Sequence, residues 1–260
     1  MTSRSADVGD IQVRYLESGA GVPVVLVHGI GQDSSSWRVQ LDTLDGVLGY
    51  AADVRGHGDT TLGAANGTLA QLSGDLCDFL DSVSGPASCV GFSMGGTIVL
   101  AAAAARPDLV RSLVLMGTSS VVGRAAAAFY ERRAAESSDR AALAAGVHED
   151  TAAGLFRAHD LDALVEGRLR AIGDGRGFAN ACRAMARVAA EPLTPLLARV
   201  EAPATVIGAQ HDTMCPRKAA DILLAGLPDA RYVEIADASH LMNVDRPDAV
   251  TVAIRDAVAG

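Results

Sequence analysis

Short apolar runs alternate with stretches of helical periodicity in the first and last thirds of this chain. The run Pro23–Val27 is apolar at every position, as in a strand whose two faces are both covered. Other strands are predicted at Ile11–Glu17, Gly49–Val54, Ala87–Phe92, Ser112–Met116, Ala204–Gly208 and Arg231–Ile235. Helices are predicted at Leu69–Val83, Met94–Arg106, Pro216–Leu227 and Pro247–Val258. Alternating strands and helices indicate an α/β fold with a mostly parallel sheet and right-handed crossovers.

The middle of the chain departs from this rhythm. Residues 121–190 carry Ala- and Arg-rich helical patterns, such as Ala125–Ala135 and Asp162–Ile172, with a break at Gly173–Gly177. We therefore expect a core made of residues 1–120 and 191–260, with a helical cap at residues 121–190 inserted between two of its strands.

Charge and composition narrow the class of partner. The net charge of −9 opposes binding to a phosphate backbone, so nucleic acid is not expected. The polar start MTSRSADVGD does not resemble a secretory signal, and the longest apolar run, Ile98–Ala105, is far shorter than the ~20 residues of a membrane span. The four cysteines lack CxxC spacing, as in a cytoplasmic protein with reduced thiols and no zinc site. We expect a cytoplasmic monomer or homodimer that acts on a small molecule away from membranes.

The segment Gly91-Phe92-Ser93-Met94-Gly95 fits the pattern G-x-S-x-G. It follows one predicted strand and opens a predicted helix, the context in which a sharp turn exposes a nucleophilic serine. Glycines around Ser93 would permit that turn, and the positive end of the helix would favour a developing anion. Ser93 is therefore the candidate nucleophile.

Four further residues complete a candidate catalytic set. The segment His28-Gly29-Ile30-Gly31 follows the strand at Pro23–Val27, so the backbone N–H groups of Ile30 and Met94 are the predicted oxyanion hole. His28 itself is expected to be structural.

His240 follows the strand at Arg231–Ile235, where the late histidine of a Ser…Asp…His order belongs. Asp212, after the strand at Ala204–Gly208, is the predicted acid that orients the histidine. Its rival Asp237 lies three residues from His240, a span too short for easy contact. The histidines at positions 57, 148, 159 and 211 are read as surface or hydrogen-bonded residues.

The segment Asp53-Val54-Arg55-Gly56-His57-Gly58 has glycines that suit a tight turn, with Asp53 expected to fix that turn by hydrogen bonds. The tryptophan at position 37 fits either the core or a wall of the cleft.

Taken together, the segments at residues 28–31, 53–58 and 91–96 with Asp212 and His240 resemble the α/β-hydrolase superfamily over nearly the whole chain. That resemblance implies an eight-stranded, mostly parallel sheet flanked by helices. Two stretches, at residues 177–188 and 238–250, are most similar to the 3-oxoadipate enol-lactonases and related esterases. Asp59-Thr60-Thr61 departs from the usual residues after the 53–58 motif, which weakens the subfamily assignment.

The predicted activity is hydrolysis of a small carboxylic ester or lactone through an acyl-enzyme, without a metal or organic cofactor. Alternatives on the same triad are hydrolysis of a C–C bond and the acyl transfer of a cofactor-free haloperoxidase or perhydrolase. A slow hydrolase-like receptor remains a third possibility. Residues 118–191 hold ten Arg and ten Asp or Glu, and one or two of these arginines are candidates to bind an anionic substrate.

Overall fold

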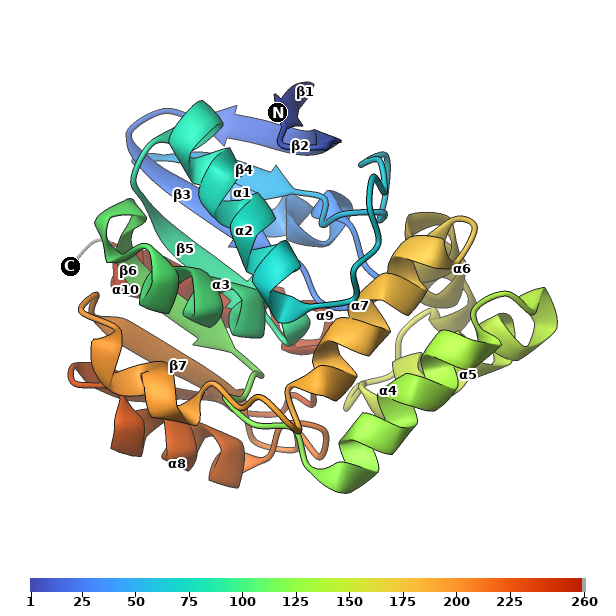
Figure 1. Cartoon of the computed structure of the whole chain (residues 1–260). Coiled ribbons are helices and arrows are strands. Elements are labelled where there is room, and N and C mark those ends of the chain that lie inside the picture. Colours follow the sequence, from blue (N-terminus) through green and yellow to red (C-terminus); the bar gives the residue numbers. More distant parts are fainter. Residues whose placement is uncertain (259–260) are drawn as a thin grey trace.

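One eight-stranded sheet forms the centre of the computed structural model, which describes residues 1–258. The strand order is β1-β2-β4-β3-β5-β6-β7-β8, and Figure 1 shows helices on both faces. The pairs β1–β2 and β2–β4 are antiparallel, whereas all later pairs are parallel. The predicted α/β-hydrolase architecture is therefore confirmed. The strands are β1 Thr2–Val8, β2 Ile11–Gly19, β3 Val22–Val27, β4 Val47–Ala52, β5 Ala87–Phe92, β6 Val110–Met116, β7 Ala204–Ala209 and β8 Ala230–Ile235.

The all-apolar strands have this composition because both of their faces are covered. In β3, Val25 and Val27 face one hydrophobic cluster, and Val24 and Leu26 face another. The first cluster includes side chains of α2 (Leu69–Phe79), α3 (Met94–Ala105) and α8 (Arg217–Gly226). The second includes side chains of α1 (Arg38–Thr43) and α10 (Pro247–Val258). Trp37 is fully buried in this second cluster, so it is a core residue and does not line a cleft.

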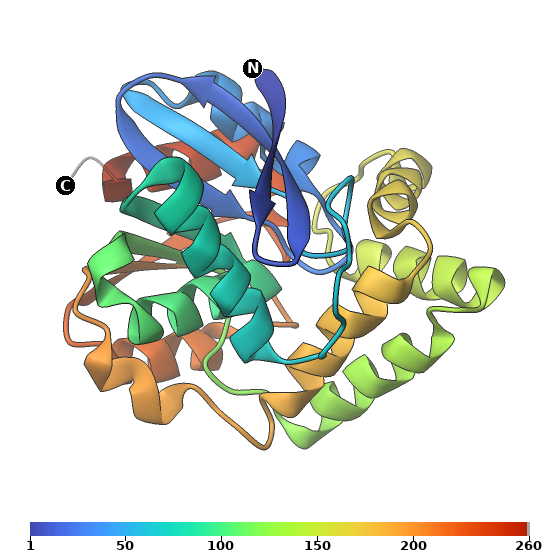
Figure 2. The same cartoon turned by 45° about the horizontal axis from the view of Figure 1, so that its top comes forward.

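The polar first residues form a strand that the hydrophobic pattern did not predict. Six of the seven residues of β1 are at least partly exposed, so the strand lacks the apolar alternation on which the prediction relied. It is an edge strand that pairs with β2 from Thr2–Glu17 to Val8–Ile11, and Gly9 adopts a φ of +56° at the turn between them. Figure 2 shows this hairpin at the front of the sheet.

Four helices occupy the segment between β6 and β7. They are α4 Arg124–Glu136, α5 Arg140–Ala153, α6 Leu161–Ile172 and α7 Arg176–Arg187. Both views show them together at one side of the sheet (Figures 1 and 2). They enclose a small apolar cluster of their own, which includes Val147, Ile172 and Phe178.

The predicted helices at Ala125–Ala135 and Asp162–Ile172 agree with α4 and α6 to within a residue. The predicted break at Gly173–Gly177 is too long, because α7 already begins at Arg176, with Gly175 in a left-handed conformation just before it. The prediction did not specify α5 or α7. The alanines and small residues of α5 give a weak amphipathic signal, whereas α7 is strongly amphipathic and its signal was not used in the prediction. The division of the chain into a core and a cap remains a prediction.

Within residues 1–258, no helix combines the length and the apolar character needed to cross a membrane.

Candidate active site

Ser93 lies at the sharp turn between β5 and α3. Its backbone has φ 52° and ψ −118°, a strained conformation for a residue with a side chain. The neighbouring backbones approach very closely at this turn. A Cβ atom on Gly95 would overlap the carbonyl groups of Val27 and His28, so β5, β3 and the start of α3 can meet at this point only if residue 95 is glycine.

Two backbone contacts of Ser93 stabilise this turn. The Ser93 N–H donates to the carbonyl of Met116 at 2.8 Å, and the Thr118 hydroxyl donates to the carbonyl of Ser93 at 2.7 Å. Both partners lie at or just beyond the end of β6. The neighbouring strand therefore fixes the conformation that carries the hydroxyl.

His240 links Ser93 to Asp212. The Nε2 atom of His240 lies 3.1 Å from Oγ of Ser93, and its Nδ1 atom lies 2.9 Å from Oδ2 of Asp212. The three residues follow β5, β7 and β8, whose carboxyl ends lie along one edge of the sheet. The structure thus brings together three side chains that the sequence separates by up to 147 residues.

The carboxylate of Asp212 also determines the tautomer of His240. An ionised carboxylate can only accept a hydrogen bond, so Nδ1 of His240 must carry the proton. That leaves the lone pair of Nε2 facing the Ser93 hydroxyl, as a general base requires.

Asp212 is itself held in an ionised state. Its Oδ1 atom accepts from the N–H groups of Met214 and Cys215, both at 2.8 Å. Burial raises the pKa of this carboxyl, but the hydrogen bond and charge of His240 and the two N–H groups together outweigh burial, so the pKa lies below its ordinary value.

The predicted oxyanion loop, residues 28–31, is held by several hydrogen bonds. His28 is buried, its Nδ1 atom donates to the carbonyl of Gly29 at 2.8 Å, and its Nε2 atom accepts from the N–H of Val54 at 2.9 Å. The N–H of Gln32 also donates to the Gly29 carbonyl, at 3.2 Å. Since N–H and C=O point in opposite directions across a trans peptide, these bonds fix the direction of the Ile30 N–H. The structural role expected for His28 is confirmed.

The second predicted oxyanion donor, the N–H of Met94, lies in the first turn of α3. N–H groups in the first turn of a helix have no acceptor within that helix and carry partial positive charge. Ile30 and Met94 thus both offer backbone donors on segments that adjoin Ser93.

A cavity of about 390 Å³ opens onto Ser93. Its walls combine residues of the Ser93 turn and of the loop after β6 with α4 and the start of α8. They are mainly apolar, including Val122, Tyr130, Met185, Met214 and Ile222. The exposed Lys218 contributes a cationic group, and no arginine of residues 121–190 lines this cavity. A cavity of this size and character can hold a small organic molecule.

The remaining candidates lie away from this cavity. Asp237, the rival acid, has an exposed side chain that pairs with Arg246 at 3.3 Å. His211 stacks on Phe156 with ring centroids 4.1 Å apart, and Nε2 of His159 lies 3.0 Å from Asp245.

His57 is not at the surface but is fully buried and hydrogen-bonded on one side only. Its Nδ1 atom donates to the carbonyl of Arg55 at 3.2 Å, while its Nε2 atom has no hydrogen-bond partner within residues 1–258. Burial lowers the pKa of His57 to about 4, with a smaller contribution from His28.

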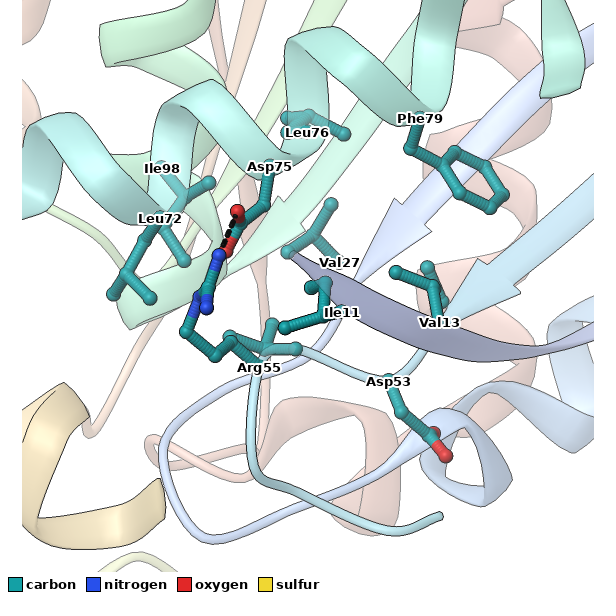
Figure 3. Close-up of a pocket in the computed structure, with 12 residues that line it drawn as sticks. Ile11, Val13, Val27, Asp53, Arg55, Leu72, Asp75, Leu76, Phe79 and Ile98 are labelled. Carbon is teal, nitrogen blue, oxygen red and sulfur yellow. Dashed lines mark hydrogen bonds and ion pairs between the residues drawn. The ribbon is translucent and has the colours of Figure 1, made fainter. Parts of the chain in front are cut away.

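The turn at residues 53–58 is held by Asp53 and Arg55. Asp53 accepts from the N–H groups of Ser34, at 2.6 Å, and Asp59, at 3.2 Å, which confirms its expected role at the turn. Arg55 forms a two-point ion pair with Asp75 beside a cavity of only about 30 Å³, and Figure 3 shows the two side chains facing each other there. This cavity has room for a water molecule or two and does not reach Ser93.

Two residues near the site escaped the sequence analysis. Asp245 has a fully buried carboxylate that accepts from the N–H of Ser239, next to His240, and from those of Phe156 and Arg157. Arg168 on α6 donates to the carbonyls of Ile30 and Gly31. Asp245 lies within the 238–250 stretch that carries the family resemblance, which could have drawn attention to it, whereas Arg168 is one of many arginines in its segment and no sequence signal distinguished it.

Within residues 1–258, no group of three or more His, Cys, Asp or Glu side chains is arranged to hold a metal ion.

Comparisons with known proteins agree with this fold. The model of the "alpha/beta hydrolase fold" family matches residues 22–247. The 3-oxoadipate enol-lactonase 1 of Acinetobacter baylyi is 25% identical over 254 residues, which cover 95% of this chain and 92% of that protein. The crystal structure of the enol-lactonase from Burkholderia xenovorans LB400 has a TM-score of 0.88 and 26% identity, covering 99% of this chain and 100% of that one.

A more local match has a different reaction in its name. The dihydrolipoyllysine-residue acetyltransferase component of the acetoin cleaving system of Cupriavidus necator is 40% identical over 114 residues. This match covers 43% of this chain and 30% of that protein. The match to this relative is partial, whereas the family match spans most of the sequence and includes the segments around Ser93, Asp212 and His240. This chain belongs to the alpha/beta hydrolase fold family.

Proposed function

We propose that this hydrolase cleaves a small carboxylic ester or lactone by nucleophilic catalysis, with Ser93 as the nucleophile. His240 takes the hydroxyl proton as Oγ attacks the carbonyl carbon, and the N–H groups of Ile30 and Met94 bind the resulting oxyanion. His240 then protonates the leaving oxygen as the C–O bond breaks, which leaves an acyl-enzyme. Finally, His240 removes a proton from water, whose oxygen attacks the acyl carbon and releases the acid and Ser93.

The observation that carries this proposal is the series of two hydrogen bonds through His240, 3.1 Å to Ser93 and 2.9 Å to Asp212. The series orients a base toward a hydroxyl on a strained turn beside an apolar cavity. In a lactone the leaving oxygen remains attached to the acyl group, and the same steps apply.

The first test uses the generic ester p-nitrophenyl acetate. The wild-type protein should release p-nitrophenol and gain an acetyl group at Ser93, detectable by mass spectrometry after rapid acid quenching. Ser93→Ala should lose both, whereas Ser82→Ala, a change at an exposed serine that does not line the cavity, should keep both. A Ser93→Ala protein with the wild-type rate would rule out the mechanism.

The lining of the cavity supports a second element of the proposal, a preference for substrates that carry a negative charge. Lys218 is the only lysine of the sequence and lies at the cavity wall. A carboxylate-bearing lactone or ester should therefore have a higher kcat/KM than a neutral one of equal size. Lys218→Met should remove that preference, while Arg217→Met, next to it and paired with Asp221, should not. Equal kcat/KM for both substrates in the wild type would contradict the preference.

The outcome of the same kinetics separates the alternatives. A hydrolase-like receptor would show one burst of p-nitrophenol followed by negligible turnover. A perhydrolase would turn over faster with added hydrogen peroxide, and a C–C hydrolase would prefer a β-diketone to any ester.

We place the reaction in the cytoplasm, a proposal supported by the four cysteines, which are unpaired in the described structure.

A further inference from the structure

The guanidinium of Arg168 contacts the backbone of the oxyanion loop from the side of the helical segment. On α6, its Nη2 atom donates to the carbonyl of Ile30 at 3.3 Å and its Nε atom to that of Gly31 at 3.4 Å. Its Nη1 atom donates to the Thr151 hydroxyl on α5 at 2.8 Å. One side chain thus joins two helices to the two carbonyls that follow the Ile30 N–H.

This arginine has no acidic partner. Arg168 takes part in none of the ion pairs formed among residues 1–258, whereas Arg133 in the same segment pairs with three acids, Glu136, Glu149 and Asp150. Burial lowers the pKa of Arg168, so its surroundings disfavour the charge. The residue is only partly buried, and its hydrogen bonds go to neutral acceptors of the loop and of Thr151, so no ion pair accounts for its place.

The loop packs closely against this arginine and its neighbours at Gly31. A Cβ atom on Gly31, which has φ +67°, would lie 3.2 Å from Nη2 of Arg168, 3.2 Å from Ile172 and 3.4 Å from Phe178. On the core side, His28 and the Gln32 N–H hold the Gly29 carbonyl. The peptide that carries the Ile30 N–H is therefore held from the core by hydrogen bonds of His28 and Gln32 and from α6 by those of Arg168.

We propose that Arg168 is a positioning residue that holds the oxyanion loop, so that the Ile30 N–H points at the reacting carbonyl oxygen only while α6 is docked. This inference rests on the proposed function, because it assumes that Ile30 supplies an oxyanion donor to an ester substrate. The expected signature is a loss in kcat with little change in KM, since the oxyanion exists in the transition state and not in the bound substrate.

The size of the expected loss in kcat follows from the role of the Ile30 N–H as an oxyanion donor. Removing an oxyanion donor outright typically lowers turnover by ~10²–10³. Arg168→Met misaligns that donor without deleting it, so we expect kcat to fall by ~10–100-fold. Arg168→Lys can bond one carbonyl but cannot span both and Thr151, so its kcat should lie between the wild type and Arg168→Met.

The experiment compares Arg168→Met, Arg168→Lys and Thr151→Val with Arg170→Met as the matched control. Arg170 is two residues further along α6, is exposed, and pairs with Glu166. For each protein, kcat and KM for p-nitrophenyl acetate are measured alongside two dissociation constants. One is for a boronic acid, which mimics the tetrahedral intermediate on Ser93, and the other is for the uncleavable amide of the same acyl group.

The proposal expects the boronate to bind more weakly by the same factor as kcat falls, with the amide unaffected and Arg170→Met unchanged. It is overturned if Arg168→Met keeps the wild-type kcat, if amide binding weakens as much as boronate binding, or if Arg170→Met loses as much. Should Arg168→Met fail to fold, Thr151→Val and Arg168→Lys decide alone, and a wild-type kcat in both would overturn it.

Acylation of the wild type distinguishes this failure from that of the proposed function. If no acyl group appears on Ser93, the proposed function is wrong. If Ser93 is acylated normally and the Arg168 variants behave like the control, only the positioning role is wrong.

Discussion

The substitution Asp212→Asn tests the orienting role of this acid, and the structure specifies how the new amide must lie. Oδ1 of Asp212 accepts two backbone N–H groups at 2.8 Å, from Met214 and Cys215. An asparagine keeps its carbonyl oxygen at that position, because an NH₂ group there would face two donors. The NH₂ group must then take the place of Oδ2 and point at Nδ1 of His240.

That orientation reverses the tautomer of His240. Nδ1 must accept from the new amide, so the ring proton moves to Nε2 and faces Oγ of Ser93, which lies 3.1 Å away. The ring can no longer accept the serine proton. The same reversal in a serine protease triad lowers kcat by ~10⁴-fold, which corresponds to about 5.4 kcal/mol of transition-state stabilisation at 1.36 kcal/mol per tenfold.

The assay is kcat for p-nitrophenyl acetate, with thermal unfolding to show that the variant is folded. KM should change little, since Asp212 lies behind His240 and makes its contacts to the ring and to backbone N–H groups. Asp237→Asn is the matched control, because Asp237 is close in sequence to His240 but its exposed side chain pairs with Arg246. The orienting role of Asp212 would be refuted by an Asp212→Asn protein that keeps more than a tenth of the wild-type kcat, or by an Asp237→Asn protein that loses as much.

Three further outcomes concern stability. Burial holds the pKa of His57 near 4, so below pH ~6.5 the unfolded chain binds a proton at this histidine and the folded protein does not. Between pH 7.5 and 5 the free energy of unfolding of the wild type should therefore fall by about 2 kcal/mol more than that of His57→Phe. Urea unfolding at each pH measures the difference. Equal losses in both proteins would contradict this assignment. Gly95→Ala should yield little folded or active protein, because the added Cβ overlaps backbone carbonyls. Gly74→Ala, with open space around it in α2, should instead raise stability by ~0.5–1 kcal/mol, as judged by thermal unfolding. Asp245→Asn should lower stability by ~2 kcal/mol or more and speed proteolysis near residue 156. The reason is that Asp245 accepts hydrogen bonds from N–H groups of both that segment and Ser239. Cleavage at the wild-type rate would argue against a role of Asp245 in joining these two segments.

Local sequence patterns were sufficient for much of the fold. The β5 and α10 predictions match the structure residue for residue, since a largely apolar segment bounded by Pro86 and the Ser93 turn and a proline-initiated amphipathic helix each carry their own signal. The π-helical turn Leu80–Ser84 after α2 was read as part of one helix, because its periodicity differs too little over five residues. The edge strand β1 was missed because its stability comes from pairing with β2, which its own polar residues do not encode.

The sequence by itself determined the α/β architecture and nominated Ser93, Asp212 and His240, because turn chemistry, strand ends and chain order are local properties. Only the tertiary structure decided which groups support them. The clamp of Arg168 on the oxyanion loop spans 137 or more residues, and the buried Asp245 joins segments 89 residues apart. Such contacts depend on how α6 and the loop around His240 pack against the core, and packing of this kind leaves no periodic or motif signal in a single sequence.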